Sequence, residues 1–118
     1  MPTPEPIPIR ISCEGQVIEV DRVAKVKKTQ KTNLKWVAQD GCGPWTIKFD
    51  KVSSVVARAN YPVEPGTPFE KDTYEVPRGG SKETEGGPVK GKVKKTYRYT
   101  VTNSVTGEVT HDPDVDVE

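Results

Sequence analysis

The chain reads LKWVA at residues 34–38 and WTIKF at residues 45–49, and these two stretches decide the fold prediction. In each of them an apolar side chain occupies every second position. Successive side chains of a β-strand point to opposite faces, so a period of two predicts strands with one buried face. The same alternation occurs in IPIRI at residues 7–11 and in YRYTV at residues 97–101. We therefore expect an all-β protein.

The residue inventory also favours strands over helices. One leucine stands against seventeen valines, five isoleucines and twelve threonines, and side chains branched at Cβ fit a pleated surface better than a helical turn. Eleven prolines and ten glycines divide the chain into short pieces. We expect about six to eight short strands in a two-sheet sandwich. The valine spacing over residues 51–59 predicts one short helix at an end of the sandwich.

The length of 118 residues (13.0 kDa) fits a single domain. We expect a flexible proline-rich arm at residues 1–6, the domain itself at residues 7–118 and a mobile glycine-rich loop at residues 79–91. The net charge of +1 gives no general electrostatic argument for a nucleic-acid or membrane partner. No apolar run approaches the ~18 residues of a membrane span, and no signal-peptide pattern follows Met1. These patterns predict a cytoplasmic protein with no membrane association.

Several motifs follow one another in an order that resembles the cupredoxin family. LKWVAQD at residues 34–40 and GPWTIKF at residues 43–49 are similar to the family segment V-x-W-x-N … P-H-T-V-x-F. TYRYTV at residues 96–101 is similar to the Y-x-Y-x-C strand that carries the copper thiolate in that family. The resemblance covers residues 7–118 and implies a Greek-key, cupredoxin-like β-sandwich. An immunoglobulin-like sandwich is the alternative, because it produces the same alternation.

The copper ligands of the family are replaced in this chain. Such a site uses two imidazoles and a thiolate, with a weak axial thioether. The resemblance places Trp45 at the first histidine position, Val101 at the cysteine and Ser104 at the second histidine, and no methionine follows Met1. Indole and valine side chains have no usable lone pair, and a neutral alcohol is a weak donor for copper. The resemblance thus implies a metal-free fold that lacks blue-copper electron transfer.

Trp45 is the candidate binding residue. An indole at the former ligand position either fills the vacated cavity or lies half-exposed and anchors a protein partner. The chain also lacks a complete catalytic constellation. We therefore expect a non-catalytic interaction or accessory module without a cofactor.

A rival hypothesis rests on the two cysteines and the single histidine. Cys13 and Cys42 could close a disulfide loop of about 29 residues, although free thiols are the expected state in a reducing compartment. His111 stands among carboxylates in the sequence THDPD, where we interpret it as a solvated turn residue. A redox or metal-dependent protein that uses Cys13, Cys42 or His111 remains the alternative from a different functional class.

The acidic C-terminal segment is interpreted as an edge strand. Asp114, Asp116 and Glu118 alternate with Val115 and Val117. The valines are expected to face the core, and the acidic side chains to face water and protect the edge, rather than to form a metal site.

Two lysine groups, at residues 25–35 and 90–98, present a third possibility. Together with Tyr97 and Tyr99 the second group resembles a surface that binds single-stranded nucleic acid. The tyrosines share the phase of Val101, however, and so belong to the buried face. We interpret both basic groups, Arg98 included, as a solvated face, and this disfavours a nucleic-acid partner.

Overall fold

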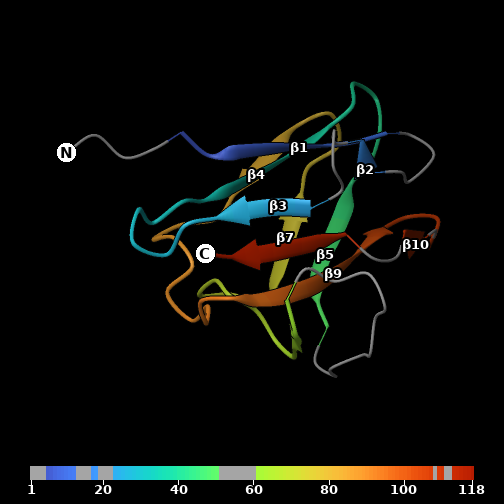
Figure 1. The fold of residues 1–118 in the computed structure, drawn as a ribbon. Coiled ribbons are helices and arrows are strands. Elements are labelled where there is room, and N and C mark those ends of the chain that lie inside the picture. Colours follow the sequence, from blue (N-terminus) through green and yellow to red (C-terminus); the bar gives the residue numbers. More distant parts are fainter. Residues whose placement is uncertain (1–4, 13–16, 19–22, 51–60, 108, 111–112) are drawn as a thin grey trace.

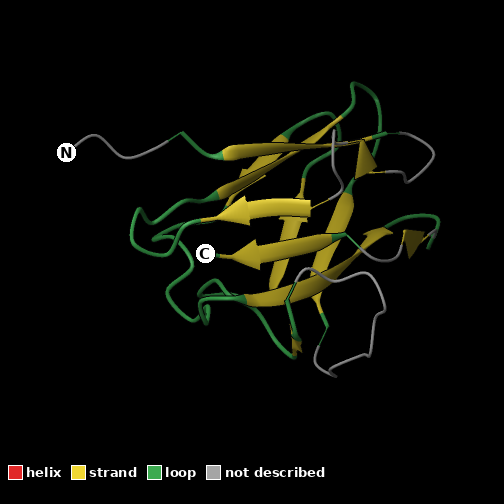
Figure 2. Cartoon of the chain, viewed as in Figure 1, coloured by secondary structure: helices red, strands yellow, loops and turns green. Residues whose placement is uncertain are grey.

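The structure is a computed structural model of the 118-residue chain and describes residues 5–12, 17–18, 23–50, 61–107, 109–110 and 113–118. The helix expected over residues 51–59 lies outside this part, as do Cys13, His111 and residues 1–4 of the expected arm. The described residues form strands, turns and loops and contain no helix (Figure 2), so within them the all-β prediction is confirmed. Nothing in the described part has the helical length and apolarity needed to cross a membrane.

The strands are short, as the spacing of prolines and glycines predicts. In chain order they are β1 (Ile7–Ile11), β2 (Val17–Ile18), β3 (Val23–Val26), β4 (Leu34–Ala38), β5 (Trp45–Phe49), β6 (Val63–Glu64), β7 (Thr73–Val76), β8 (Ser81–Glu83), β9 (Lys95–Asn103), β10 (Val109–Thr110) and β11 (Asp114–Val117).

These strands form two sheets that pack against each other (Figure 1). The first has the order β2-β1-β4-β8, and the second has the order β3-β11-β9-β5-β7, with β6 and β10 also paired to β9. β1 runs parallel to β4, and β3 runs parallel to β11, whereas β9 is antiparallel to both β5 and β11. The two-sheet prediction is thereby confirmed.

The apolar residues that alternate with polar ones in the sequence are the buried residues of the strands. In β4 and β5 every second side chain is buried, beginning with Leu34 and Trp45. The core between the sheets is rich in aromatic rings. Trp36 from the first sheet packs against Tyr74, Tyr99 and Phe49 from the second, with ring centroids 5.2, 5.7 and 6.4 Å apart. Such tilted and edge-on pairs add to the free energy gained by burying the rings.

The prediction that β11 is a water-facing edge strand is wrong. β11 lies between β3 and β9, and the side chains of Asp114 and Asp116 are buried, with relative exposures of 7% and 1%. Arg98 of β9, expected in the solvated face, is also buried at 9%. The phase of the alternation is as predicted, because Val115 and Val117 lie in the core. The outer face of these two central strands is buried as well.

The expected loop at residues 79–91 also contains regular structure. Ser81–Glu83 forms β8 and pairs with β4 in the antiparallel sense, with Trp36 opposite Lys82. Thr84 extends this contact, because its backbone N–H donates to the carbonyl of Leu34 at 2.9 Å. The segment is therefore an edge strand of the first sheet.

Candidate functional site

The three positions assigned to vacated copper ligands lie at one end of the β5–β9 pair. Trp45 is opposite Asn103 in the register, and Ile47 is opposite Val101. The side chains of Trp45 and Val101 are fully buried in the core. Ser104 follows β9, and its exposed hydroxyl lies 2.8 Å from the hydroxyl of Thr46, whose position in β5 alternates with the buried Trp45. The structure therefore places Trp45 and Val101 on the inner face of neighbouring strands, two residues apart in the register, and leaves Ser104 on the outer face.

This set of residues does not fit a copper ion. The inner face offers an indole and an isopropyl group, and neither supplies a lone pair to a metal. Trp45 also has no exposed surface, so it offers nothing for a partner to contact in this structure. Its indole edge lies against Gly43, where a Cβ atom would approach the ring to 3.0 Å. Trp45 fills the interior, and we do not assign it to a docking surface.

Cys42 is disulfide-bonded, so the prediction of free thiols is wrong for this residue. Cys13 is the other cysteine of the sequence and lies outside the described residues. A sulfur atom held in a disulfide is not a thiolate, so it acts neither as a nucleophile nor as a soft metal ligand until the bond is reduced. Within the described part of the chain no three His, Cys, Asp or Glu residues gather in a way that could hold a metal ion.

The buried aspartates of β11 already have partners on β9. The guanidinium group of Arg98 contacts both carboxylate oxygens of Asp114, with Nε 2.9 Å from Oδ1 and Nη2 3.4 Å from Oδ2. The hydroxyl of Thr96 donates to Oδ1 of Asp116 at 2.6 Å. These contacts link two neighbouring strands and offset the energetic cost of burying the acidic side chains.

The two lysine groups that are separate in the sequence meet at one end of the sandwich. Lys28 donates its backbone N–H to the carbonyl of Glu118 at 2.9 Å, and Lys94 donates to the carbonyl of Val117 at 2.7 Å. The loop after β3 and the segment before β9 therefore flank the end of β11 (at the left of Figure 1). We call this surface the lysine pole; its members are Lys27, Lys28, Lys31, Lys90, Lys92, Lys94 and Lys95.

A second contact fixes the two loops to each other. The side-chain oxygen of Asn33 accepts the backbone N–H of Gly87 at 2.8 Å and the hydroxyl of Thr84 at 2.9 Å. Gly87 lies so close to Lys31 that a Cβ atom on it would overlap the Lys31 backbone. The sequence analysis identified both lysine groups but did not predict that they lie side by side. They meet because β3 pairs with β11 in the parallel sense, and a pairing between distant segments leaves no pattern in the local sequence.

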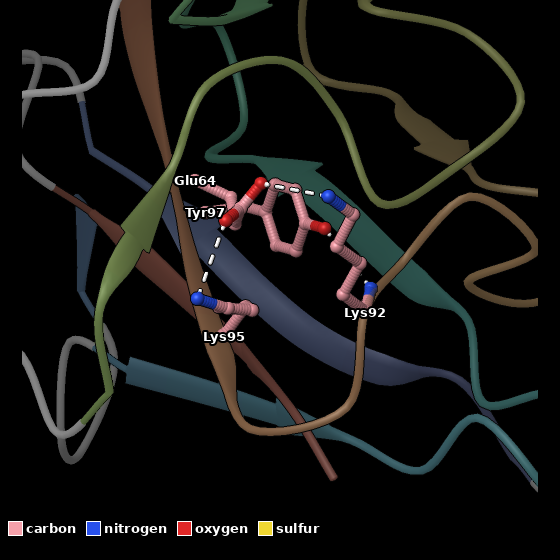
Figure 3. Close-up of polar contacts among 4 residues, drawn as sticks. All are labelled: Glu64, Lys92, Lys95 and Tyr97. Carbon is pink, nitrogen blue, oxygen red and sulfur yellow. Dashed lines mark hydrogen bonds and ion pairs between the residues drawn. The ribbon is translucent and has the colours of Figure 1, made fainter.

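One carboxylate organises part of the lysine pole (Figure 3). Glu64 of β6 lies between the ammonium groups of Lys95 and Lys92, at 3.3 and 3.4 Å, while the backbone N–H of Lys92 donates to the hydroxyl of Tyr97 at 2.9 Å. Partial burial alone would raise the pKa of Glu64, but the hydrogen bonds and positive charges of Lys95 and Lys92 hold that pKa below its ordinary value of 4.5. Glu64 is therefore ionised at neutral pH and orients both lysines.

No protein-family model, curated protein or solved structure matches the chain. Among the described residues the candidate site is the lysine pole, since the fold there gathers an excess of lysines from segments far apart in the sequence.

Proposed function

We propose that the protein is a metal-free, non-catalytic interaction module with a cupredoxin-like Greek-key topology. The order of the motifs along residues 34–49 and 96–101 supports this proposal, together with the two packed sheets. The immunoglobulin-like sandwich remains the alternative topology. In either topology, the two sheets would serve as a rigid scaffold that presents an interaction surface.

The observation that carries the proposal is the burial of Trp45 and Val101. Both side chains are at 0% exposure on the inner face, at the positions where the resemblance expects an imidazole and a thiolate. Filling such a position with apolar atoms avoids the energetic cost of an empty cavity, and it leaves no donor for copper. On this proposal the chain keeps the two-sheet sandwich but has no residues that could bind copper at these positions.

The rival redox or metal-dependent function has less support. The disulfide removes Cys42 as a thiolate, while Cys13 and His111, the other candidate residues, lie outside the described residues. The proposal and this rival differ in a simple test. Purified protein is analysed for metals, and its absorption spectrum is recorded after addition of copper in native buffer without reductant. We expect no stoichiometric metal and no visible copper–thiolate band, and one equivalent of tightly held metal would refute the proposal.

The disulfide of Cys42 also indicates the redox state of the cellular compartment in which the protein would be found. Disulfides persist in oxidising environments and are rare in the cytosol. We propose an oxidising compartment in place of the cytoplasm expected from the sequence. Alkylation of free thiols before cell lysis, followed by mass measurement, should find Cys42 unmodified; an alkylated Cys42 would restore the cytoplasmic expectation.

A further inference from the structure

The lysine pole carries positive charge that the described residues do not neutralise. Lys92 and Lys95 share Glu64, but no described carboxylate forms an ion pair with Lys28, Lys31 or Lys94. All three are exposed. Glu85, on the segment before β9, and Glu118, directly after β11, reduce the local excess of positive charge without cancelling it. An acidic partner would therefore find several ammonium groups available for pairing.

The backbone holds two of these lysines in an unfavourable conformation. Lys31 and Lys94 have φ angles of 53° and 63°, in the left-handed region that residues with a side chain seldom adopt. Such positions persist when the surrounding structure imposes them, and they cluster where a protein binds a ligand. Here the surrounding contacts are the hydrogen bond of Lys94 to β11 and the packing of Gly87 on Lys31.

Exposed apolar side chains lie among the lysines. Val89 and Val93 are each 52% exposed, and they alternate with the basic residues in the sequence VKGKVKK at residues 89–95. Protein interfaces combine an apolar centre with charged groups at the rim. The lysine pole has both components on one segment.

The chemistry of the pole favours a protein over the other anionic macromolecules. Single-stranded nucleic acids need aromatic faces for base stacking, and among the described residues every exposed large apolar side chain is a valine. Phosphate groups are recognised best by the planar fork of arginine, whereas this surface contains lysine. Membrane surfaces are usually entered by tryptophan, phenylalanine or leucine.

We propose that the lysine pole, with Val89 and Val93, is the docking surface for an acidic protein segment that also carries apolar residues. This inference deepens the proposed interaction function and rests on it. The acidic side chains of the segment pair with Lys28, Lys31 and Lys94, and its apolar side chains cover the two valines. Glu64 holds Lys92 and Lys95 in place at the rim.

The test uses the intact protein and a fluorescein-labelled peptide of Glu-Glu-Val repeats, with binding followed by fluorescence anisotropy. We expect saturable binding that weakens as salt is raised. A Glu-Glu-Ser repeat peptide and a Val89→Ser/Val93→Ser variant should each bind more weakly, because the apolar contact is lost. Failure of the Glu-Glu-Val peptide to bind would overturn the proposal.

A charge-reversed pair localises the site. Lys28→Glu/Lys94→Glu should lower the affinity for the Glu-Glu-Val peptide by about tenfold or more. The matched control is Lys48→Glu/Lys82→Glu, on exposed positions of β5 and β8, which changes the net charge equally and should leave the affinity unchanged. Circular dichroism confirms that both variants are folded. An equal loss in both variants would contradict the assignment.

Two further probes separate the competing partners. Tighter binding to oligothymidylate of equal charge, or to phosphatidylcholine vesicles containing phosphatidylserine, would overturn the proposal in favour of a nucleic acid or a membrane surface. Uptake of copper would instead refute the proposed function, whatever the peptide does. The two failures are thus distinguishable on the same preparation.

Discussion

Arg98 and Asp114 show how a single pair of side chains can decide whether two strands fit together. The pair is buried, and both carboxylate oxygens of Asp114 face the guanidinium group. A buried ion pair adds little compared with an apolar pair of the same size, but removal of one member leaves an uncompensated charge. The consequences of mutation are therefore asymmetric.

Replacement of Asp114 by alanine should lower the free energy of unfolding by about 3–5 kcal/mol, because the buried guanidinium group of Arg98 loses the carboxylate that its Nε and Nη2 contact. Urea denaturation measures this loss. The double variant Arg98→Met/Asp114→Leu should be more stable than Asp114→Ala, since it removes both charges. A double variant less stable than the single one would show that the pair is not an isolated unit.

Glu64 predicts how stability depends on pH. Its pKa in the folded protein is below the ordinary value of 4.5, so its contribution to stability is present above that pH and is lost as the pH falls through the folded pKa. A Glu64→Gln variant should lose stability less steeply in acid than the unmodified protein. Urea midpoints measured from neutral pH into the acid range make the comparison, and parallel curves would contradict the lowered pKa.

At the scale of elements, the contact between the two lysine-bearing loops decides whether the lysine pole exists. The loops touch through Asn33 and through the close approach of Gly87 to Lys31. Gly87 has a φ of 73°, and Gly107 in the turn after β9 has a φ of 77°, but a Cβ atom added to Gly107 would meet no other atom within 4 Å. The two glycines therefore have the same backbone conformation, but only at Gly87 would an added Cβ atom collide with a neighbouring residue.

Gly107→Ala should cost about 1–2 kcal/mol from left-handed backbone strain alone. Gly87→Ala should cost more and should separate the two loops, because the new Cβ would overlap the backbone of Lys31. Thermal unfolding measures both losses. Equal losses would mean that the loops do not rely on this contact.

The sequence predicted the elements whose two faces differ in polarity. The alternation of apolar and polar residues predicted strands at residues 7–11, 34–38 and 45–49, and the structure has strands with these same bounds. It could not find β8, because Ser-Lys-Glu has no apolar side chain and depends on pairing with β4. It also placed β11 at an edge, since polar side chains on the second face predict exposure unless an ion pair such as Arg98–Asp114 allows burial.

At the scale of the whole molecule, Cys42 lies in the core between the two sheets and is held in a disulfide. The sequence offered the pair Cys13 and Cys42, but spacing alone does not show whether two cysteines meet in space. The lysine pole escaped prediction for a related reason, because the pairing of β3 with β11 joins distant segments.

Reduction of the disulfide should destabilise the protein by about 3 kcal/mol, the value expected for the loop of about 29 residues that a bond between Cys42 and the other cysteine of the sequence would close. The reason is that the unfolded chain gains conformational freedom when the loop is opened. Denaturant unfolding with and without dithiothreitol measures the difference. Identical midpoints would indicate that the bond does not constrain the unfolded chain.

Tryptophan emission during a copper titration tests the central claim most directly, because the proposed cupredoxin resemblance places Trp45 at the position of a copper ligand. Trp36 and Trp45 are both fully buried, so the emission should be blue-shifted and should not change saturably as copper is added. Stoichiometric, saturable quenching would place a metal ion beside Trp45 and contradict the account of an interior filled by apolar side chains.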